Sequence, residues 1–201
     1  MGRSSSLLNK IRLFQFALLI GGAVLILGGD QLRRSDLQYP GIALIGLSTV
    51  TYGLQALLSR QISFRDEHRI MMSYRGLAAA SWGLMLMLAG LAVIGGAVAA
   101  VLGIEQALFE MLRARPGLIV APLGVIFVLR SVAAMVGPDH PRRGLWGKVR
   151  RLFGFLLGLI GLVLGAATIA LGIWDLYNPG VLQQVLESIS VWFLALLSQV
   201  G

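Results

Sequence analysis

The sequence has no cysteine and very little charge. With no thiol among its 201 residues, the chain can hold no disulfide, thiolate metal site or cysteine nucleophile. Asp, Glu, Lys and Arg together make up only 13% of the residues, about half of their share in a soluble domain. A surface that faces water on all sides needs more charge than this, and a disordered chain needs lower hydrophobicity. These two shortages exclude an ordinary soluble domain and a disordered protein.

Long apolar runs are what the sequence has in abundance. Hydrophobic residues make up 57% of the chain, and its mean hydropathy is +0.81. Since about 20 apolar residues cross the hydrocarbon layer as a helix, these runs predict an all-α integral membrane protein. A membrane barrel would alternate apolar and polar residues, whereas Leu84–Leu102 carries no polar side chain. We expect a single membrane domain over residues 1–201, a bundle of five to six transmembrane helices, with spans at about 13–29, 38–59, 76–103, 116–137 and 152–174.

The C-terminal stretch Gly180–Gly201 allows two predictions. Its second half is apolar, but Gln183, Gln184 and Glu187 lie in its first half. A helix at about 180–200 is therefore either a sixth span or an amphipathic helix on the membrane surface.

Basic residues gather on one side of the predicted spans. Twelve of the 17 Lys and Arg precede the first span, or lie between the second and third or between the fourth and fifth. By the positive-inside rule the N-terminus is cytoplasmic, and we expect a multi-pass protein of a bacterial cytoplasmic membrane. The last of these basic groups is expected to contact anionic lipid headgroups, and nothing in the charge pattern requires nucleic acid. That group comprises Arg142, Arg143, Lys148, Arg150 and Arg151.

Proline–glycine pairs recur along the chain, at Pro40-Gly41, Pro116-Gly117 and Pro179-Gly180. Proline is tolerated in the first turn of a helix, so each pair predicts the start of the returning helix of a hairpin. The first and fifth spans also begin alike, as Arg12-Leu13-Phe14 and Arg151-Leu152-Phe153. We therefore expect three tandem helical hairpins that are parallel repeats, related by an axis along the membrane normal.

Glycines recur at intervals of seven residues, close to two helical turns, and so form smooth faces on the predicted helices. Small residues let helix backbones approach closely in lipid, where no hydrophobic force brings helices together. We expect these faces to pack helices within the chain; the alternative is a homo-oligomer interface or docking in a larger membrane complex. The glycines concerned are Gly21, Gly28, Gly83, Gly90, Gly154, Gly158, Gly161 and Gly165.

Arg130 is the one charge inside a predicted span, and an intramembrane charge is by default a functional hypothesis. Three roles are open for it: snorkelling toward the headgroups, contact with carbonyls or Gln55 of another helix, or binding of a substrate or anion. The second span holds the one polar cluster within a span, from Ser48 to Gln55. Arg130, Thr51 and Gln55 therefore form the candidate polar site.

The two histidines lie in predicted cytoplasmic loops, within Asp66-Glu67-His68 and Asp139-His140. Neither loop has the histidine spacing of a metal site, so we interpret both as solvated loops. No residue is expected to be catalytic, to bind a cofactor or to ligate a metal.

A family resemblance is carried by Leu18-Leu19-Ile20-Gly21 through Gly29, by the proline–glycine helix starts, and by Gly83-Leu84-x-Leu86-x-Leu88-x-Gly90. With three hairpins, short outer turns and basic inner loops, the chain resembles the HdeD-like family of small bacterial membrane proteins. The resemblance implies a multi-helix membrane protein that is not an enzyme and is associated with acid or envelope stress. It implies no functional residue.

Three functions are consistent with these patterns. The first is a non-enzymatic membrane protein with a structural or stress-related role. The second is an accessory subunit that docks in a larger membrane protein complex through its glycine faces. The third is a small transporter or channel that uses the polar cluster of the second span.

Overall fold

Five helices are long and apolar enough to cross a membrane, and the chain is an all-α, multi-pass membrane protein. The structure is a computed structural model that describes residues 3–65, 71–137, 145–185 and 187–188. The candidate spans contain 20 to 27 residues. At 1.5 Å per residue they are about 30–40 Å long, enough for the hydrocarbon layer. The helices are α1 (Arg3–Gln31), α2 (Ser35–Ser59), α3 (Leu77–Val101), α4 (Glu105–Ala114), α5 (Gly117–Val136) and α6 (Leu145–Tyr177).

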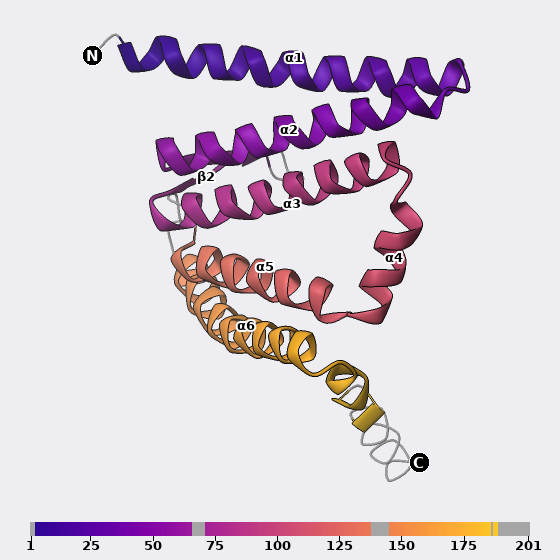
Figure 1. The fold of residues 1–201 in the computed structure, drawn as a ribbon. Coiled ribbons are helices and arrows are strands. Elements are labelled where there is room, and N and C mark those ends of the chain that lie inside the picture. Colours follow the sequence, from indigo (N-terminus) through magenta and orange to yellow (C-terminus); the bar gives the residue numbers. More distant parts are fainter. Residues whose placement is uncertain (1–2, 66–70, 138–144, 186, 189–201) are drawn as a thin grey trace, which may run out of the picture.

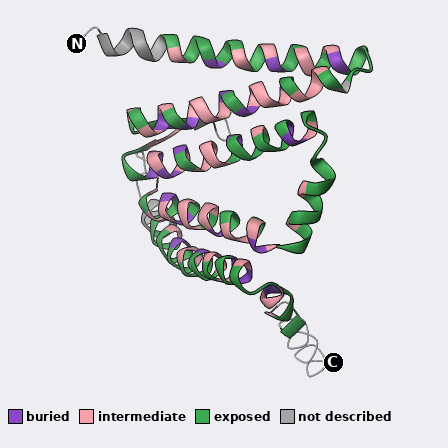
Figure 2. Cartoon of the chain, in the orientation of Figure 1, coloured by how far each residue is buried: buried purple, intermediate pink, exposed green. Residues whose placement is uncertain are grey.

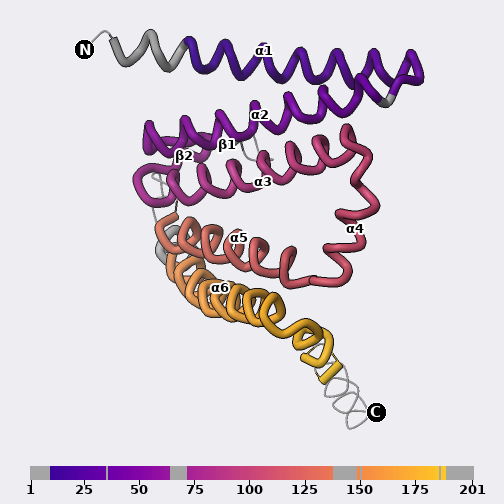
Figure 3. Tube along the Cα trace, in the orientation of Figure 1, coloured from indigo at the N-terminus to yellow at the C-terminus, as the bar shows by residue number. Residues whose placement is uncertain are grey.

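The five long helices lie side by side in one row, in the order α1, α2, α3, α5 and α6 (Figure 1). Each runs back along the one before it, and α4 crosses between α3 and α5, as the trace in Figure 3 shows. We call this row the helix slab. Exposed residues recur along every helix (Figure 2), and no more than 28% of the most apolar part of any described span is buried. Both faces of the slab are therefore left to lipid or to another protein.

The two ends of the slab differ in charge. The start of α1, the end of α2, the start of α3, the end of α5 and the start of α6 lie at one end, which we call the basic end (Figure 1). The described basic residues there include Lys10, Arg12, Arg60, Arg75 and Arg151. The α1–α2 turn, α4 and the end of α6 lie at the opposite end, where an exposed ion pair joins Arg34 to Asp36 at 2.8 Å.

A short β hairpin lies at the basic end between α2 and α3, where we expected a solvated loop. Strand β1 (Gln61–Arg65) pairs antiparallel with β2 (Met71–Arg75), so that Ile62 lies opposite Tyr74. Ile62 is only 4% exposed and belongs to a small core with Ala56 of α2 and Ala79 of α3. Apolar and polar residues alternate throughout β1 and from Met72 to Arg75 in β2, which is the period-two signal of a half-buried strand. The hairpin ties the basic ends of α2 and α3 together.

Pro40 does not begin a helix, which corrects the first of the three proline–glycine predictions. Helix α2 begins at Ser35, so Pro40 lies in its second turn. Its missing N–H leaves the Asp36 carbonyl without its intrahelical partner, and Asp36 and Pro40 are both exposed at the end of the slab. Pro116, in contrast, is the N-cap of α5. Residues 181–185 are helical, and residues 189–201 of the predicted C-terminal helix lie outside the described residues.

Facing glycines bring α2 and α3 into close contact. A Cβ placed on Gly53 would lie 2.5 Å from the Gly83 carbonyl oxygen, and one on Gly83 would lie 2.6 Å from the Gly53 oxygen. Two turns further along, a Cβ on Gly90 would lie 2.6 Å from the Gly46 oxygen. All four glycines are buried. The backbones of these two helices touch at positions where even alanine does not fit.

The α1–α2 contact uses the glycines one residue later than expected. A Cβ on Gly22 would lie 2.7 Å from the Gly41 oxygen, and one on Gly29 would lie 2.8 Å from the Gln38 side chain. Gly21 has only a distant neighbour, at 3.8 Å, and Gly28 has no atom within 4 Å. Gly28 therefore packs against no described residue of this chain, which corrects the expectation that it packs a helix within the chain. The seven-residue spacing is shared by both glycine pairs, so it could not tell which pair faces α2.

Helices α5 and α6 are joined in the same way. A Cβ on Gly124 would lie 2.9 Å from the Gly165 oxygen, and one on Gly165 would lie 3.0 Å from the Gly124 oxygen. Gly158 lies against Met135 and the Ser131 oxygen, and Gly161 against the Ser131 hydroxyl. Gly154 is looser, since its nearest neighbour, the Ala134 oxygen, lies at 3.4 Å.

The contact between α3 and α5, which we call the α3–α5 seam, lacks such glycines. Those of α5 face α6, whereas those of α3 face α2 or, in the case of Gly95 and Gly96, have no atom within 4 Å. Helix α4 has ten residues and is therefore about 15 Å long, more than the 8–10 Å between packed helix axes. Because α4 crosses between the ends of α3 and α5, it holds these ends apart (Figure 1). The two helices meet toward the basic end.

Candidate functional site

Polar side chains join α1 to α2 inside the slab. The Gln15 Nε2 donates to the Gln55 Oε1 at 3.0 Å, and the Ser48 hydroxyl donates to the Gln15 main-chain oxygen at 3.2 Å. Gln15 and Ser48 are both buried. Such interhelical hydrogen bonds stabilise membrane helices modestly, by about 0.6 kcal/mol on average. The Gln55 side chain is thus engaged in pairing two helices.

Five further hydroxyl groups of the spans donate to the backbone of their own helices. Each bonds a carbonyl oxygen three or four residues earlier, at 2.7–3.0 Å. Each hydroxyl therefore donates its hydrogen bond within its own helix and needs no partner on a neighbouring helix or a ligand. The donors are Thr49, Thr51, Ser81, Ser131 and Thr168.

Arg130 meets an aromatic ring across the α3–α5 seam. Its guanidinium carbon lies 4.9 Å from the centroid of the Trp82 ring, within the range of a cation–π contact. The Trp82 ring in turn lies 6.0 Å from the Tyr74 ring of β2, tilted by 54°. None of the three roles considered for Arg130 named this partner. The contact joins Arg130, the only charge of the α5 span, to α3, which packs beside α5 on the side away from α6.

The structure does not gather the three residues of the candidate polar site. Thr51 and Gln55 belong to α2, and Arg130 belongs to α5, with α3 between these two helices (Figure 1). The Thr51 hydroxyl donates to the Ser48 oxygen at 2.9 Å, and Gln55 accepts from Gln15. The three side chains therefore act in three separate contacts.

Asp175 is the most deeply buried polar residue of the described chain, with 0% exposure. Its Oδ2 accepts from the Gly117 N–H at 2.9 Å, and its Oδ1 accepts from the N–H groups of Gly180 and Leu182 at 3.3 and 3.2 Å. The first N–H groups of a helix have no partner within the helix, and their dipoles favour a negative charge. One carboxylate thereby caps both α5 and the helical segment that begins at residue 181. Gly117 permits this approach, because a Cβ there would meet Asp175.

Two sequence signals pointed to these contacts. Asp175 precedes Pro179-Gly180 closely, and an acidic residue near a helix start is a capping signal. Trp82 lies five residues after the start of α3, and Arg130 lies six residues before the end of α5. In antiparallel helices these positions have nearly equal depth, so matching the depths of charged and aromatic residues would have suggested the pair.

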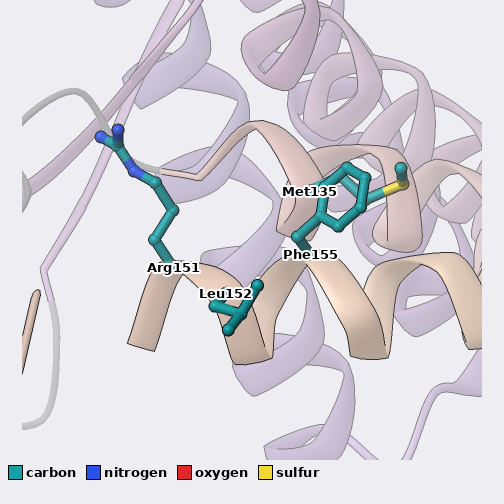
Figure 4. Close-up of a pocket in the computed structure, with 4 residues that line it drawn as sticks. All are labelled: Met135, Arg151, Leu152 and Phe155. Carbon is teal, nitrogen blue, oxygen red and sulfur yellow. The ribbon is translucent and has the colours of Figure 1, made fainter. Parts of the chain in front are cut away.

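The residues expected at lipid headgroups are described only in part. Arg142 and Arg143 lie outside the described residues, as do Asp66-Glu67-His68 and Asp139-His140. Arg151 is exposed near the start of α6 and borders an open depression of about 340 Å³ with Met135, Leu152 and Phe155. Figure 4 shows the Phe155 ring beside Met135, with Arg151 directed away from both. Apolar walls with a single charge lack the converging polar groups of a substrate site.

Comparison with known proteins adds no relative. No protein-family model matches the sequence, and no curated protein or solved structure is significantly similar to it. The resemblance to the HdeD-like family stays a prediction, and the function rests on the geometry of this chain.

Proposed function

We propose that the chain is a non-enzymatic structural protein of a bacterial cytoplasmic membrane. The observation that carries this proposal is the use of polar side chains within the spans. The described amide and hydroxyl groups there bond other parts of the protein, and glycine contacts pair the helices closely. A transport path needs polar groups that are available to a passing solute, often a chain of Asp, Glu or His across the membrane. In the slab, the described polar groups instead form hydrogen bonds within the protein.

Flux through reconstituted protein tests this proposal against the transporter alternative. Proteoliposomes with the wild-type chain are expected to release ions and small solutes no faster than protein-free liposomes. A Thr51→Val, Gln55→Leu double variant is expected to behave in the same way. Wild-type flux that falls in this double variant would contradict the structural role and support the transporter.

An accessory subunit of a larger complex is the second candidate function. It is favoured by the single row of helices, which leaves both faces of the slab open, and by the free surface at Gly95 and Gly96. Purification in mild detergent followed by mass spectrometry of the intact assembly distinguishes the two. A second protein in fixed stoichiometry supports the subunit, whereas the chain alone or as a homo-oligomer supports the stand-alone protein.

The orientation and the stress-related role complete the proposal. We place the basic end in the cytoplasm, on the strength of the positive-inside rule. Because the chain has no cysteine, a single one at Ser63 or at Arg33 reports one end cleanly. In intact cells an impermeant thiol reagent is expected to label Arg33→Cys and to spare Ser63→Cys; the reverse pattern would invert the orientation. The stress-related part depends on the family resemblance alone, and equal survival of a deletion strain and its parent under acid or envelope stress would remove it.

A further inference from the structure

The contact with the Trp82 ring covers one face of the Arg130 guanidinium but uses none of its hydrogen-bond donors. A guanidinium has five N–H donors around its edge, and a ring that covers its face occupies none of them. Arg130 is exposed, and within the described residues no carboxylate lies within 4.0 Å of it. Hydrocarbon cannot solvate these donors, so a charge at this position needs a further partner.

The depth of Arg130 identifies where that partner lies. Six residues separate it from the end of α5 at Val136, which corresponds to about 9 Å along the helix axis. The long side chain of arginine snorkels over such a distance and brings its charge toward the headgroup level. The lipid phosphates of the leaflet at the basic end are therefore the groups toward which its edge donors are directed by snorkelling.

We propose that an anionic phospholipid of this leaflet binds at the α3–α5 seam, with its phosphodiester on the Arg130 guanidinium and an acyl chain along the Trp82 ring. A guanidinium binds phosphate through two parallel N–H donors, which ammonium groups cannot do. Tryptophan suits the membrane interface, because its ring is apolar while its N–H is polar. The proposal goes beyond the structural role, since it assigns a ligand to the one loosely packed helix contact of the slab.

Charge complementarity selects an anionic headgroup over a zwitterionic one. The basic end carries Lys10, Arg12, Arg60 and Arg151 in addition to Arg130. This positive field attracts a headgroup of net negative charge and repels the ammonium of a zwitterionic lipid. Phosphatidylglycerol is therefore the expected kind of ligand, and phosphatidylcholine is the contrasting probe.

Mass spectrometry of the intact full-length protein in detergent micelles tests the proposal. After titration with phosphatidylglycerol, the wild type is expected to retain one lipid that Arg130→Gln binds at least about tenfold more weakly. The matched control is Arg115→Gln, which removes an exposed arginine at the opposite end and is expected to bind as the wild type does. Equal retention by Arg130→Gln and the wild type would overturn the site. Equal affinity of the wild type for phosphatidylcholine would overturn its preference for anionic lipid.

A second experiment needs no variant. Phosphatidylglycerol with a photoreactive headgroup is expected to crosslink to peptides from the basic ends of α3 and α5 in the wild-type protein. Labelling confined to other helices would contradict the proposal. Millimolar inorganic phosphate is expected to leave the lipid in place, and displacement by it would assign the site to a free anion instead. These outcomes are independent of the flux and copurification results, so the ligand and the structural role can fail separately.

Discussion

The glycine-packed helix pairs and the α3–α5 seam show two ways to join helices in a membrane. In the α2–α3 pair the backbones approach until a Cβ on Gly53 would lie 2.5 Å from the facing oxygen. At the seam, no described glycine faces the neighbouring helix, and a cation–π contact between Trp82 and Arg130 joins the two sides. Close packing draws its stability from many van der Waals contacts, whereas a single ring contact supplies little. The slab is therefore two tightly built units, α1–α2–α3 and α5–α6, held together at one seam.

The largest expected effect comes from filling the glycine contact between α2 and α3. A Gly53→Ala, Gly90→Ala double variant places both new methyl groups under 3.0 Å from backbone atoms, which cannot move aside cheaply. Each substitution is expected to lower the free energy of unfolding by about 1–3 kcal/mol. Circular dichroism during unfolding in sodium dodecyl sulfate measures this loss.

The control for that variant lies on α3, the helix that also carries Gly90. Gly95 and Gly96 are exposed with no atom within 4 Å, so Gly95→Ala, Gly96→Ala adds the same two methyl groups to open space. This variant is expected to unfold as the wild type does or slightly later, because alanine favours helix over glycine. If both double variants lost the same stability, close packing would not distinguish the α2–α3 pair from its surroundings.

The next largest loss of stability is expected at Asp175. Its hydrogen bond to the start of α5 adds a buried polar contact to the α5–α6 unit. Asp175→Ala removes an acceptor from three N–H groups and leaves that of Gly117 buried without a partner. The expected loss is about 2–3 kcal/mol in the same unfolding measurement.

Asp36→Ala is the matched control for this loss. Asp36 is an acidic residue at the same end of the slab, but its ion pair with Arg34 is exposed. Exposed ion pairs contribute little, so Asp36→Ala is expected to change the unfolding midpoint far less than Asp175→Ala does. A similar shift in both variants would show that Asp175 acts through general charge and not as a cap.

The sequence predicted the spans well because their signal is summed over about 20 residues. The five runs of apolar residues correspond to the five candidate spans, although the α1 and α6 helices extend beyond them. The β hairpin was missed because its five-residue strands contribute little to such a sum. The choice between Gly21 with Gly28 and Gly22 with Gly29 depends on how α1 rotates about its axis. That rotation is set by contacts with α2, which one-dimensional spacing does not contain.

The polar contacts were harder to predict for a related reason. Asp175 and Gly117 are 58 residues apart and belong to different predicted hairpins, whereas Trp82 and Arg130 belong to the two helices of one predicted hairpin that a long linker separates. The sequence marks Asp175 as a possible cap and Arg130 as an intramembrane charge, but only the order of the helices in the slab shows which partner each residue meets. A polar site made of Arg130, Thr51 and Gln55 would need α2 and α5 to be neighbours, but α3 lies between them.

The smallest expected effect is the loss of the ring contact at the seam. Arg130→Gln removes the cation from Trp82 and leaves the glycine contacts intact, so in lipid-free micelles the free energy of unfolding is expected to fall by about 0.5–1 kcal/mol. Amide hydrogen exchange localises the change: the basic ends of α3 and α5 should exchange faster, while α1 and α2 should keep their protection. Arg115→Gln is again the control. A loss as large as that of Asp175→Ala would mean that the seam is as strong as the helix pairs it joins, and the division of the slab into two units would be wrong.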